Sequence, residues 1–433
     1  MSDPIALKGP VSRIDATVEV PGSKSQANRA LVCAFLAEGS SRISNVPNGD
    51  DTAALIEAMR VAGAATMRDG TVDVTGGSAD RLPSSVWCNL AGTTSRFLTA
   101  VGSLSSHDVT VDGGDALRGR PMHDLHDALR SLGARVKTLG SPGHLPVRVG
   151  GTSPTGRQVA LKGDVSSQFI TSLMLIGPCL PDGLEIRVEG PLVSAPYIEM
   201  TAEVMRWFGA EVDVSLEQIT VRPGRYVGRS CSVEPDFSSA AFPIVATVIG
   251  GGRVRVPGLA SSRLQGDSRV LEIVSRMGAI VTTEGSDVVV VREPSRTVQP
   301  IFEDMGDCSD LVPVVAAACL VATGESVISG VGFIRGKESN RLEDLAAELR
   351  LLGADVHATA DGLRVVGGRP LRHASLATHH DHRLGMAFAT LSSVAPGLVI
   401  KDPHVVSKSW PGYFEVMAPV IGPAEDRPLR FSR

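Results

Sequence analysis

The chain alternates apolar segments of helical length with amphipathic ones, and the alternation repeats from end to end. Six times, a turn rich in Gly, Ser, Thr and Asp runs directly into a long apolar segment. These turns recur about every 72 residues and are marked by Ser25, Thr93, Ser167, Ser239, Ser309 and Asp381. Short polar side chains at such places cap free backbone N–H groups, so each turn predicts the start of a buried helix.

A second marker closes the amphipathic segments. An apolar residue followed by Gly and Ala ends five of them, at Gly63, Gly133, Gly209, Gly278 and Gly353, with a degenerate sixth copy at Gly422. Glycine after a periodic apolar segment predicts a left-handed helix C-cap, and the β-branched run that follows predicts a strand. The chain is therefore predicted to be six α/β units, each roughly strand–helix–strand–helix–strand. The longest apolar run, near 312–322, is predicted to be a buried helix.

Composition narrows the class of protein. The 433 residues suffice for two or three domains, and 43% hydrophobic with 21% charged residues is ordinary globular composition. A net charge of −5 argues against a general nucleic-acid or anionic-membrane binder, although it allows a local basic cleft. The six scattered cysteines predict free thiols in a reducing compartment. With no signal segment and no long apolar run, a cytoplasmic protein is expected.

Basic residues gather at the predicted helix starts. A helix N-terminus offers free N–H donors and about half a positive charge, so it is suited to anions. Lysines and arginines lie in or beside these turns and the loops near them: Lys24, Arg29, Arg96, Arg120, Arg335, Lys337, Arg341, Arg383 and Lys408. A single such residue is usually a solvated or capping charge. Their recurrence at equivalent places predicts binding of small phosphorylated carboxylic acids.

The order of these motifs resembles the enolpyruvyl transferase family. From Val20 to about Phe414 the chain carries PGSKSQANRA, AGTTSR, GRP, GDVSSQF, SAPYIEMT, RGKESNR, DHR and KSWP in the family's order. The set is specific, whereas AGT or DHR alone would be weak. The resemblance implies a two-domain inside-out α/β barrel, with three βαβαββ repeats in each domain and the active site in the interdomain cleft. The domains are expected at 1–20 with 236–433, and at 21–235.

Within the family, the wording is nearest to members that act on shikimate 3-phosphate. The resemblance implies transfer of the enolpyruvyl group of phosphoenolpyruvate to the 5-hydroxyl of that acceptor, with release of phosphate. The reaction is an addition–elimination through a tetrahedral ketal phosphate, without metal, cofactor or covalent enzyme intermediate. It belongs to the shikimate pathway of aromatic amino acid biosynthesis and is the target of glyphosate. The expected partners are these two small molecules, with no nucleic acid and no membrane, bound by a monomer.

The resemblance also assigns residues. Phosphoenolpyruvate falls to Lys24, Gly92, Arg120, Gln168, Arg341, Arg383 and Lys408, and shikimate 3-phosphate to Ser25, Arg29, Ser166, Ser167, Gln168, Ser194, Tyr197, Asp310 and Lys337. Asp310 is implied as the base for the hydroxyl and Glu338 as the acid for C3, with Lys24 and Lys337 also among the catalytic groups. Simple ion pairing with neighbouring Arg and Lys is the alternative for both carboxylates.

At four positions the residue differs from the one that is common in the family's motifs. Leu90 replaces an Asn, which Asn89 could supply from a shifted turn, and Phe97 replaces a Pro. Phe333 replaces a polar residue and cannot donate a hydrogen bond, so one acceptor contact is in doubt. Asn340 replaces an Asp, which should leave Arg341 less tied. These changes leave room for a paralogue with a different acceptor or altered inhibitor sensitivity.

Two other functions compete. A sister enzyme of the family uses a UDP-linked amino sugar, but Asp115 in the DGGDALRGRP loop and the Lys24-Ser25 pair favour shikimate 3-phosphate. A non-catalytic phospho-ligand binding protein of the same fold is the second alternative. The presence of both Asp310 and Glu338, which binding alone does not need, argues against it.

Overall fold

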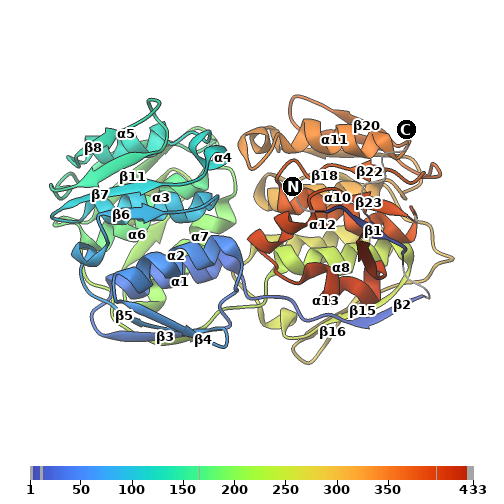
Figure 1. The fold of residues 1–433 in the computed structure, drawn as a ribbon, viewed down its shortest axis with the longest axis horizontal. Helices are drawn as coiled ribbons and strands as arrows, with labels where there is room; N and C mark the ends of the chain where they lie inside the picture. Colours follow the sequence, from blue (N-terminus) through green and yellow to red (C-terminus); the bar gives the residue numbers. More distant parts are fainter. Residues whose placement is uncertain (1–2, 10–12, 165, 396, 427–433) are drawn as a thin grey trace. The chain divides into compact units, whose positions relative to one another are not determined.

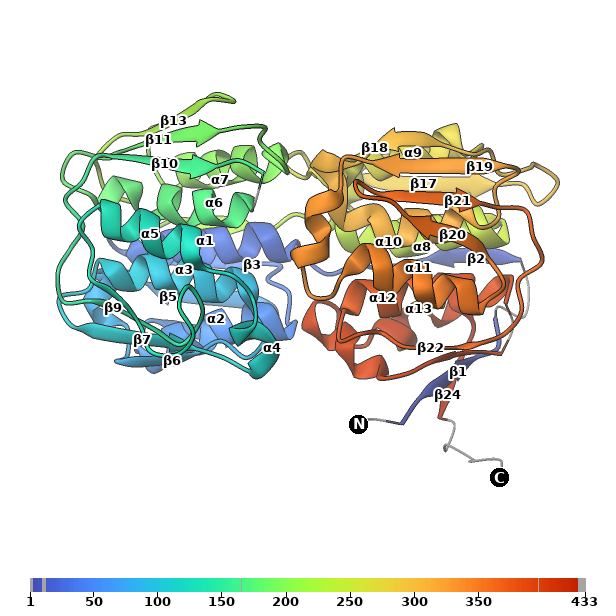
Figure 2. The same cartoon turned by 90° about the horizontal axis from the view of Figure 1, so that it is seen from above.

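The chain forms two compact units of similar construction (Figure 1). The computed structural model describes residues 3–9, 13–164, 166–395 and 397–426. Unit 1 comprises Met1–Pro21 and Pro235–Arg433, and unit 2 comprises Gly22–Glu234. Within each unit, four-stranded sheets lie outside and helices lie between them (Figure 2).

Unit 2 contains three sheets, each with one parallel and two antiparallel strand pairs. Their strand orders are β14 (Ser230–Ser232), β3 (Ser40–Ser44), β5 (Thr71–Thr75), β4 (Ala65–Arg68); β6 (Ser85–Trp87), β7 (Asp108–Asp112), β9 (Val147–Gly150), β8 (Val136–Thr138); and β10 (Gln158–Lys162), β11 (Leu184–Glu189), β13 (Gln218–Val221), β12 (Val212–Val214). The last strand of the unit, β14, completes the first sheet by pairing in parallel with β3.

Two kinds of helix fill each repeat of unit 2. The first kind, α1 (Lys24–Leu36), α3 (Gly92–Ser103) and α6 (Ser167–Ile176), is buried on nearly every side. The second kind, α2 (Asp50–Val61), α5 (His123–Ser131) and α7 (Ala195–Trp207), buries one face. A single turn, α4 (Asp115–Arg118), interrupts the second repeat.

Unit 1 repeats the design and includes the first strands of the chain. Its sheet orders are β16 (Ile280–Glu284), β17 (Asp287–Arg292), β15 (Gly252–Val256), β2 (Ile14–Thr17); β18 (Phe302–Asp304), β19 (Glu325–Ser329), β21 (Leu363–Val366), β20 (Asp355–Ala358); and β22 (Ser375–Leu376), β23 (Leu398–Ile400), β1 (Ile5–Leu7), β24 (Ala424–Asp426). Strand β2 pairs in parallel with β15, and β1 lies between β23 and β24. Two of the three sheets are therefore completed by residues before Pro21.

The helices of unit 1 follow the same rule. The buried ones are α8 (Phe237–Gly250), α10 (Val312–Cys319) and α12 (His382–Ala389), and the one-faced ones are α9 (Val270–Arg276), α11 (Arg341–Leu351) and α13 (Tyr413–Ile421). Four short 3-10 turns precede or face them: η4 (Gly266–Arg269), η5 (Gly306–Leu311), η6 (Gly332–Gly336) and η8 (Pro403–Lys408). The apolar run near 312–322 is thus a buried helix, as predicted.

The six repeats are confirmed, but among the described residues a side chain caps only three of the six buried helices, at Ser166, Asp236 and Asp381. The six helix-ending glycines Gly63, Gly133, Gly209, Gly278, Gly353 and Gly422 have φ of 64°, 90°, 88°, 103°, 84° and 81°. All six have positive φ, which costs a residue with a Cβ about 1–2 kcal/mol, although the ψ of 166° at Gly422 lies outside the left-handed helical region. The six turn markers all lie at or beside the starts of the buried helices.

Replacing Gly63 by alanine should lower the free energy of unfolding of unit 2 by about 1–2 kcal/mol. No atom lies within 4 Å of the added Cβ, so backbone strain is the only cost. Gly224 is the matched control: its Cβ position is equally open and its φ is not left-handed. Gly224→Ala should leave stability unchanged or slightly raised. Urea unfolding of both variants checks this, and equal midpoints would contradict the cap assignment.

Among the described helices, none is both long enough and apolar enough to cross a membrane.

Candidate functional site

Arg29 of α1 binds groups of both α1 and α7. Its Nε donates to Thr201 Oγ1 at 2.7 Å, its Nη1 to the Ser25 carbonyl at 2.8 Å and its Nη2 to the Tyr197 carbonyl at 3.2 Å. The side chain is 2% exposed, and burial lowers the pKa of Arg29 to about 10. In this arrangement Arg29 fixes the predicted ligand residues Ser25 and Tyr197 relative to each other. Its own donors are directed to protein groups.

A second set of contacts gathers two guanidinium groups at the start of α3. A Cβ at Gly92 would lie 2.5 Å from Arg120 Nη1 and 3.1 Å from Arg96 Nη1, so only glycine lets both approach the helix. Arg96 donates to Gln168 Oε1, and Ser166 Oγ accepts from the Gln168 N–H at 3.3 Å as the cap of α6. The predicted residues Gly92, Arg120, Gln168 and Ser166 are thereby brought together.

Lys24 and Ser194 complete the unit 2 cluster, the name used here for Lys24, Ser25, Arg29, Gly92, Arg96, Arg120, Ser166, Ser167, Gln168, Ser194 and Tyr197. Lys24 Nζ lies 2.9 Å from Asp51 Oδ2, and the Asp51 carbonyl accepts from Thr94 Oγ1 at 2.8 Å. Asp51 thus ties the starts of α1 and α3 together. Ser194 is buried with a left-handed φ of 57° and precedes α7, and its carbonyl accepts from the Tyr197 N–H.

In unit 1, Arg341 binds three carboxylates from three different segments. Its Nε lies 2.7 Å from Asp381 Oδ2, its Nη1 2.8 Å from Asp310 Oδ1 and its Nη2 2.7 Å from Glu338 Oε2. The side chain is 1% exposed. Burial acts to lower the pKa of Arg341, but the charges of the three carboxylates raise it well above its usual value. The predicted acid and base are therefore held by one guanidinium.

Asp310 is held by a second arginine. Arg383 Nη2 lies 2.8 Å from Asp310 Oδ2, and Lys337 adds a third nearby positive charge. Burial acts to raise the pKa of Asp310, but the charges of Arg383, Lys337 and Arg341 outweigh it and hold that pKa well below its usual range. Lys408 Nζ lies 3.1 Å from Glu338 Oε1. The unit 1 cluster is defined as Asp310, Lys337, Glu338, Arg341, Asp381, Arg383 and Lys408.

The structure shows where the four unusual residues lie. Leu90 is 41% exposed, and Asn89 Oδ1 accepts a hydrogen bond from Trp87 Nε1 at 2.8 Å. Phe97 is fully buried with its ring 5.7 Å from the Arg29 guanidinium. The Phe333 ring lies 5.7 Å from Lys337 Nζ. Both aromatic residues therefore contact a cation of the clusters.

Whether Asn340 leaves Arg341 less tied than an Asp would stays a prediction. Asn340 accepts from the Glu343 N–H as the N-cap of α11, and among the described residues it makes no hydrogen bond to Arg341. Arg341 is instead bound by Asp381, Asp310 and Glu338. A carboxylate at position 340 is not needed to fix it.

Two anchoring carboxylates were missed by the sequence analysis. Asp381 was treated only as a helix start, yet it caps α12 by accepting from the Arg383 N–H at 2.9 Å and also binds Arg341. Asp51 gave no signal, because it lies 27 residues from its partner Lys24. The DHR motif could have suggested the first, since the aspartate adjoins a basic residue in a turn. Nothing local could have suggested the second.

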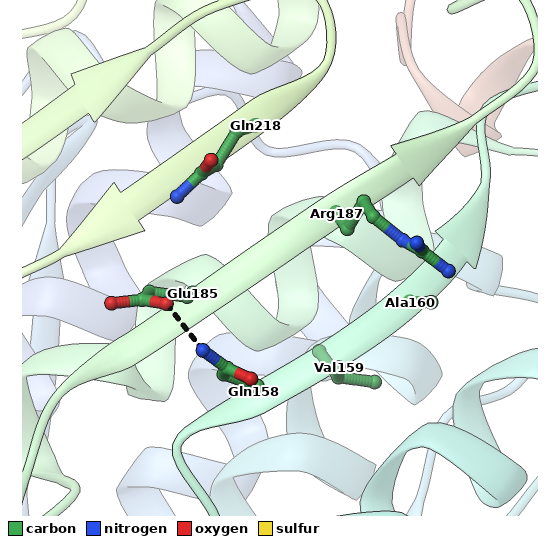
Figure 3. A pocket seen from close by; sticks show the side chains of 6 residues that line it. All are labelled: Gln158, Val159, Ala160, Glu185, Arg187 and Gln218. Atoms are coloured by element: carbon green, nitrogen blue, oxygen red, sulfur yellow. Dashed lines mark hydrogen bonds between the residues drawn. The ribbon is translucent and has the colours of Figure 1, made fainter.

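Chemically, the two clusters offer cations for anionic ligands and two carboxylates for proton transfer. No group of three or more metal-ligating side chains was found among the described residues. A hollow on the outer face of the sheet β10–β11–β13 is lined by Gln158, Glu185, Arg187 and Gln218, with Gln158 Nε2 bound to Glu185 Oε2 at 2.8 Å (Figure 3). It contains none of the predicted site residues, so the clusters are the candidate site.

The repeats and basic helix starts define the enolpyruvyl transferase fold. The chain aligns with the enolpyruvyl transferase NikO of Streptomyces tendae at 20% identity, with a TM-score of 0.76 and coverage of 98% of this chain and 99% of that one. With the EPSP synthase of Acinetobacter baumannii the identity is 25% and the TM-score 0.81, again over 98% and 99%.

Sequence comparison identifies the family more narrowly. The profile of EPSP synthase (3-phosphoshikimate 1-carboxyvinyltransferase) matches residues 8–417. The 3-phosphoshikimate 1-carboxyvinyltransferase of Trichormus variabilis is 36% identical over 97% of this chain and 100% of its own length. That of Methanothermobacter thermautotrophicus is 37% identical over 93% and 95%. The chain belongs to the EPSP synthase family.

Proposed function

We propose that this chain is a 3-phosphoshikimate 1-carboxyvinyltransferase, which transfers the enolpyruvyl group of phosphoenolpyruvate to the 5-hydroxyl of shikimate 3-phosphate. Family membership supports the activity. The observation that carries it is the bridging of Asp310 and Glu338 by the single buried guanidinium of Arg341. Binding of anions alone would need the cations and would be weakened by two carboxylates, whereas the reaction needs both a base and an acid.

The proposed ligand residues are drawn from the unit 2 cluster and from the unit 1 cluster. Phosphoenolpyruvate is assigned to Lys24, Gly92, Arg120, Gln168, Arg341, Arg383 and Lys408, and shikimate 3-phosphate to Ser25, Arg29, Ser166, Ser167, Gln168, Ser194, Tyr197, Asp310 and Lys337. Forked guanidinium groups suit the planar carboxylate and the phosphate oxygens of these ligands. For Arg29, whose donors already bind protein groups, the supported role is to hold Ser25 and Tyr197 in place.

Asp310 is proposed as the base that takes the proton of the 5-hydroxyl. The hydroxyl oxygen forms a bond to C2 of phosphoenolpyruvate, and the proton passes to the Asp310 carboxylate. With its pKa below its usual range, Asp310 is ionised but a weak base. An anionic substrate bound to Arg383 and Arg341 would offset the charges that lower this pKa. Substrate binding would therefore strengthen the base.

Glu338 is proposed as the acid that protonates C3 of phosphoenolpyruvate. Its two oxygens bind Arg341 and Lys408, which are both proposed phosphoenolpyruvate ligands. A substrate anion would compete with Glu338 for these cations, and losing them favours the protonated form that an acid needs. Glu338 would then take a proton back from C3 while the C2–O bond to phosphate breaks, which completes the elimination and releases phosphate.

The assay for this proposal measures phosphate release. The purified chain should release phosphate only when phosphoenolpyruvate and shikimate 3-phosphate are both present. The proposed acceptor is wrong if the chain turns over unphosphorylated shikimate or a UDP-linked amino sugar but not the proposed pair. That outcome would support the paralogous transferase. Binding of both ligands without phosphate release would support a non-catalytic protein. Repeating the assay with glyphosate tests whether Leu90 and Phe97 alter inhibition.

We also propose that the chain acts as a monomer in the cytoplasm, with no cofactor. All six cysteines are free, and four of them are buried, which suits a reducing compartment. The two proposed ligand sets use residues of one chain only. Size-exclusion chromatography with light scattering checks the monomer.

A further inference from the structure

Asp267 is a buried carboxyl group that none of the proposed roles uses. It lies in η4, is 3% exposed, and accepts a hydrogen bond from Ser238 Oγ at Oδ2. Its Oδ1 has no hydrogen-bond partner among the described residues. A buried carboxylate with one oxygen unsatisfied is costly, so a specific cation or a proton must compensate it.

Ser238, in the first turn of α8, links Asp267 to Arg383. Arg383 Nη2 lies 3.5 Å from Ser238 Oγ and 2.8 Å from Asp310 Oδ2. Ser238 therefore accepts from Arg383 while it donates to Asp267. This polarity requires that Asp267 Oδ2 carries no proton, so a proton taken up by Asp267 belongs on Oδ1. The Arg383 guanidinium, which binds the proposed base Asp310, is thus also linked through Ser238 to the carboxyl group of Asp267.

Charged and titratable groups surround Asp267 on every packed element. They are Asp307, Cys308 and Asp310 on η5, Asp236 at the start of α8, Arg383 on α12, Glu272 and Arg276 on α9, Arg269 on its own turn, and Glu303 of β18, which binds Arg269 at 3.1 Å and Arg276 at 2.8 Å. Burial, with the charges of Asp310 and Asp236, raises the pKa of Asp267 to about 7, against the charge of Arg383 and the hydrogen bond from Ser238, which act to lower it. Arg383 is the one cation among these causes that favours ionised Asp267.

We propose that Asp267 is a positioning residue for Arg383 and that it takes up one proton when an anionic substrate binds that guanidinium. This inference rests on the proposed function, which places phosphoenolpyruvate at Arg383. The substrate's negative charge offsets the cation that stabilises ionised Asp267, so a proton from the buffer binds Oδ1. Asp310 and the substrate then share Arg383 without a third negative charge. When phosphate leaves, the proton returns to the buffer.

Proton uptake can be measured by titration calorimetry in two buffers of different ionisation enthalpy. Phosphoenolpyruvate is titrated into the full chain in the presence of shikimate 3-phosphate. With a pKa of about 7, about a tenth of Asp267 is protonated at pH 8 and about nine tenths at pH 6. The wild type should therefore take up close to one additional proton at pH 8 and little at pH 6. Equal uptake at both pH values overturns the proposal.

Three variants separate Asp267 from other groups. Asp267→Asn keeps an acceptor for Ser238 but cannot titrate, so it should lose the uptake at pH 8 and raise the KM for phosphoenolpyruvate more than it lowers kcat. Ser238→Ala removes a hydrogen bond that lowers the Asp267 pKa, so its uptake should fall at pH 8 and persist at higher pH. Asp307→Asn, an exposed carboxylate on the facing turn, is the control and should behave as wild type. Uptake retained in Asp267→Asn overturns the proposal.

A measurement without substrate tells whether a failure lies with Asp267 or with the proposed function. The folded pKa of Asp267 is raised, so the stability that its proton contributes is present at low pH and is lost as pH rises through about 7. The gain in Tm from Asp267→Asn should therefore be larger at pH 8.5 than at pH 5.5. If that difference is absent, Asp267 does not titrate as proposed. If it is present while phosphoenolpyruvate does not bind, the proposed function is wrong and the substrate linkage falls with it.

Discussion

Replacing Arg341 by methionine should lower the free energy of unfolding of unit 1 by about 3–5 kcal/mol. The side chain is 1% exposed and binds Asp381, Asp310 and Glu338 through Nε, Nη1 and Nη2. Methionine fills much of the same volume but leaves Asp381, which is fully buried, without this ion pair. An uncompensated buried charge costs far more than the pair itself contributes. Activity should be lost as well, since Asp310 and Glu338 lose a common anchor.

The control is Arg350→Met, on the exposed side of the same helix α11. It removes the same charge and should change stability by less than about 0.5 kcal/mol. Arg341→Lys is an intermediate case, because an ammonium group cannot reach three carboxylates in the directions of a planar fork. Urea unfolding with a probe in unit 1 measures all three. Equal midpoints for Arg341→Met and Arg350→Met would show that the ion cluster does not stabilise the fold.

Features set by neighbouring residues in the chain could be predicted from the sequence. The helix starts at Ser25 and Asp381 and the C-cap at Gly353 depend on a few adjacent residues, and their recurrence identified six repeats. The division into buried and one-faced helices followed from apolar periodicity. The site residues came from motifs instead, and the contacts between them were not visible in the sequence.

Contacts over long sequence separations could not be predicted. Asp381 lies 40 residues from Arg341, and Thr201 lies 172 residues from Arg29. The resemblance assigned Arg29 to the ligand, and the structure adds that its buried side chain binds two backbone carbonyls. Side-chain polarity at a helix start does not distinguish an arginine that binds a ligand from one that binds protein groups, because both place an arginine in the same turn. Only the hydrogen-bond partners of its N–H groups distinguish the two.

The two aromatic departures acquire a common explanation. The Phe97 ring lies 5.7 Å from the Arg29 guanidinium, and the Phe333 ring lies 5.7 Å from Lys337 Nζ. An aromatic face attracts a cation without using any of its N–H donors. Phe333 therefore positions Lys337 and leaves its ammonium hydrogens for other acceptors. That Phe333 removes one hydrogen bond to the acceptor stays a prediction, which the acceptor assay can test.

Glu338→Gln and Asp310→Asn should each reduce kcat by about 100-fold or more, the scale of lost acid–base catalysis. Both amides keep the size of the side chain and a hydrogen-bond acceptor for Arg341, but neither can exchange a proton as the carboxyl group does. Their controls are Glu343→Gln, an exposed carboxylate two residues beyond Arg341, and Asp307→Asn on the same turn as Asp310. Both controls should retain wild-type kcat.

The pH dependence separates the two roles. Because the pKa of Asp310 lies below its usual range, Asp310 remains ionised as pH falls to about 5, and the acid side of the kcat/KM profile should not report its protonation. Asp310→Asn should therefore lower kcat/KM by a similar factor from about pH 5 to 8. The measurement is the pH profile of kcat/KM for the wild type and the variants, with Tm values to verify that each variant is folded. Folded variants with near-normal kcat would reduce both carboxylates to partners of Arg341, and the bridged acid and base would then be a structural ion cluster only.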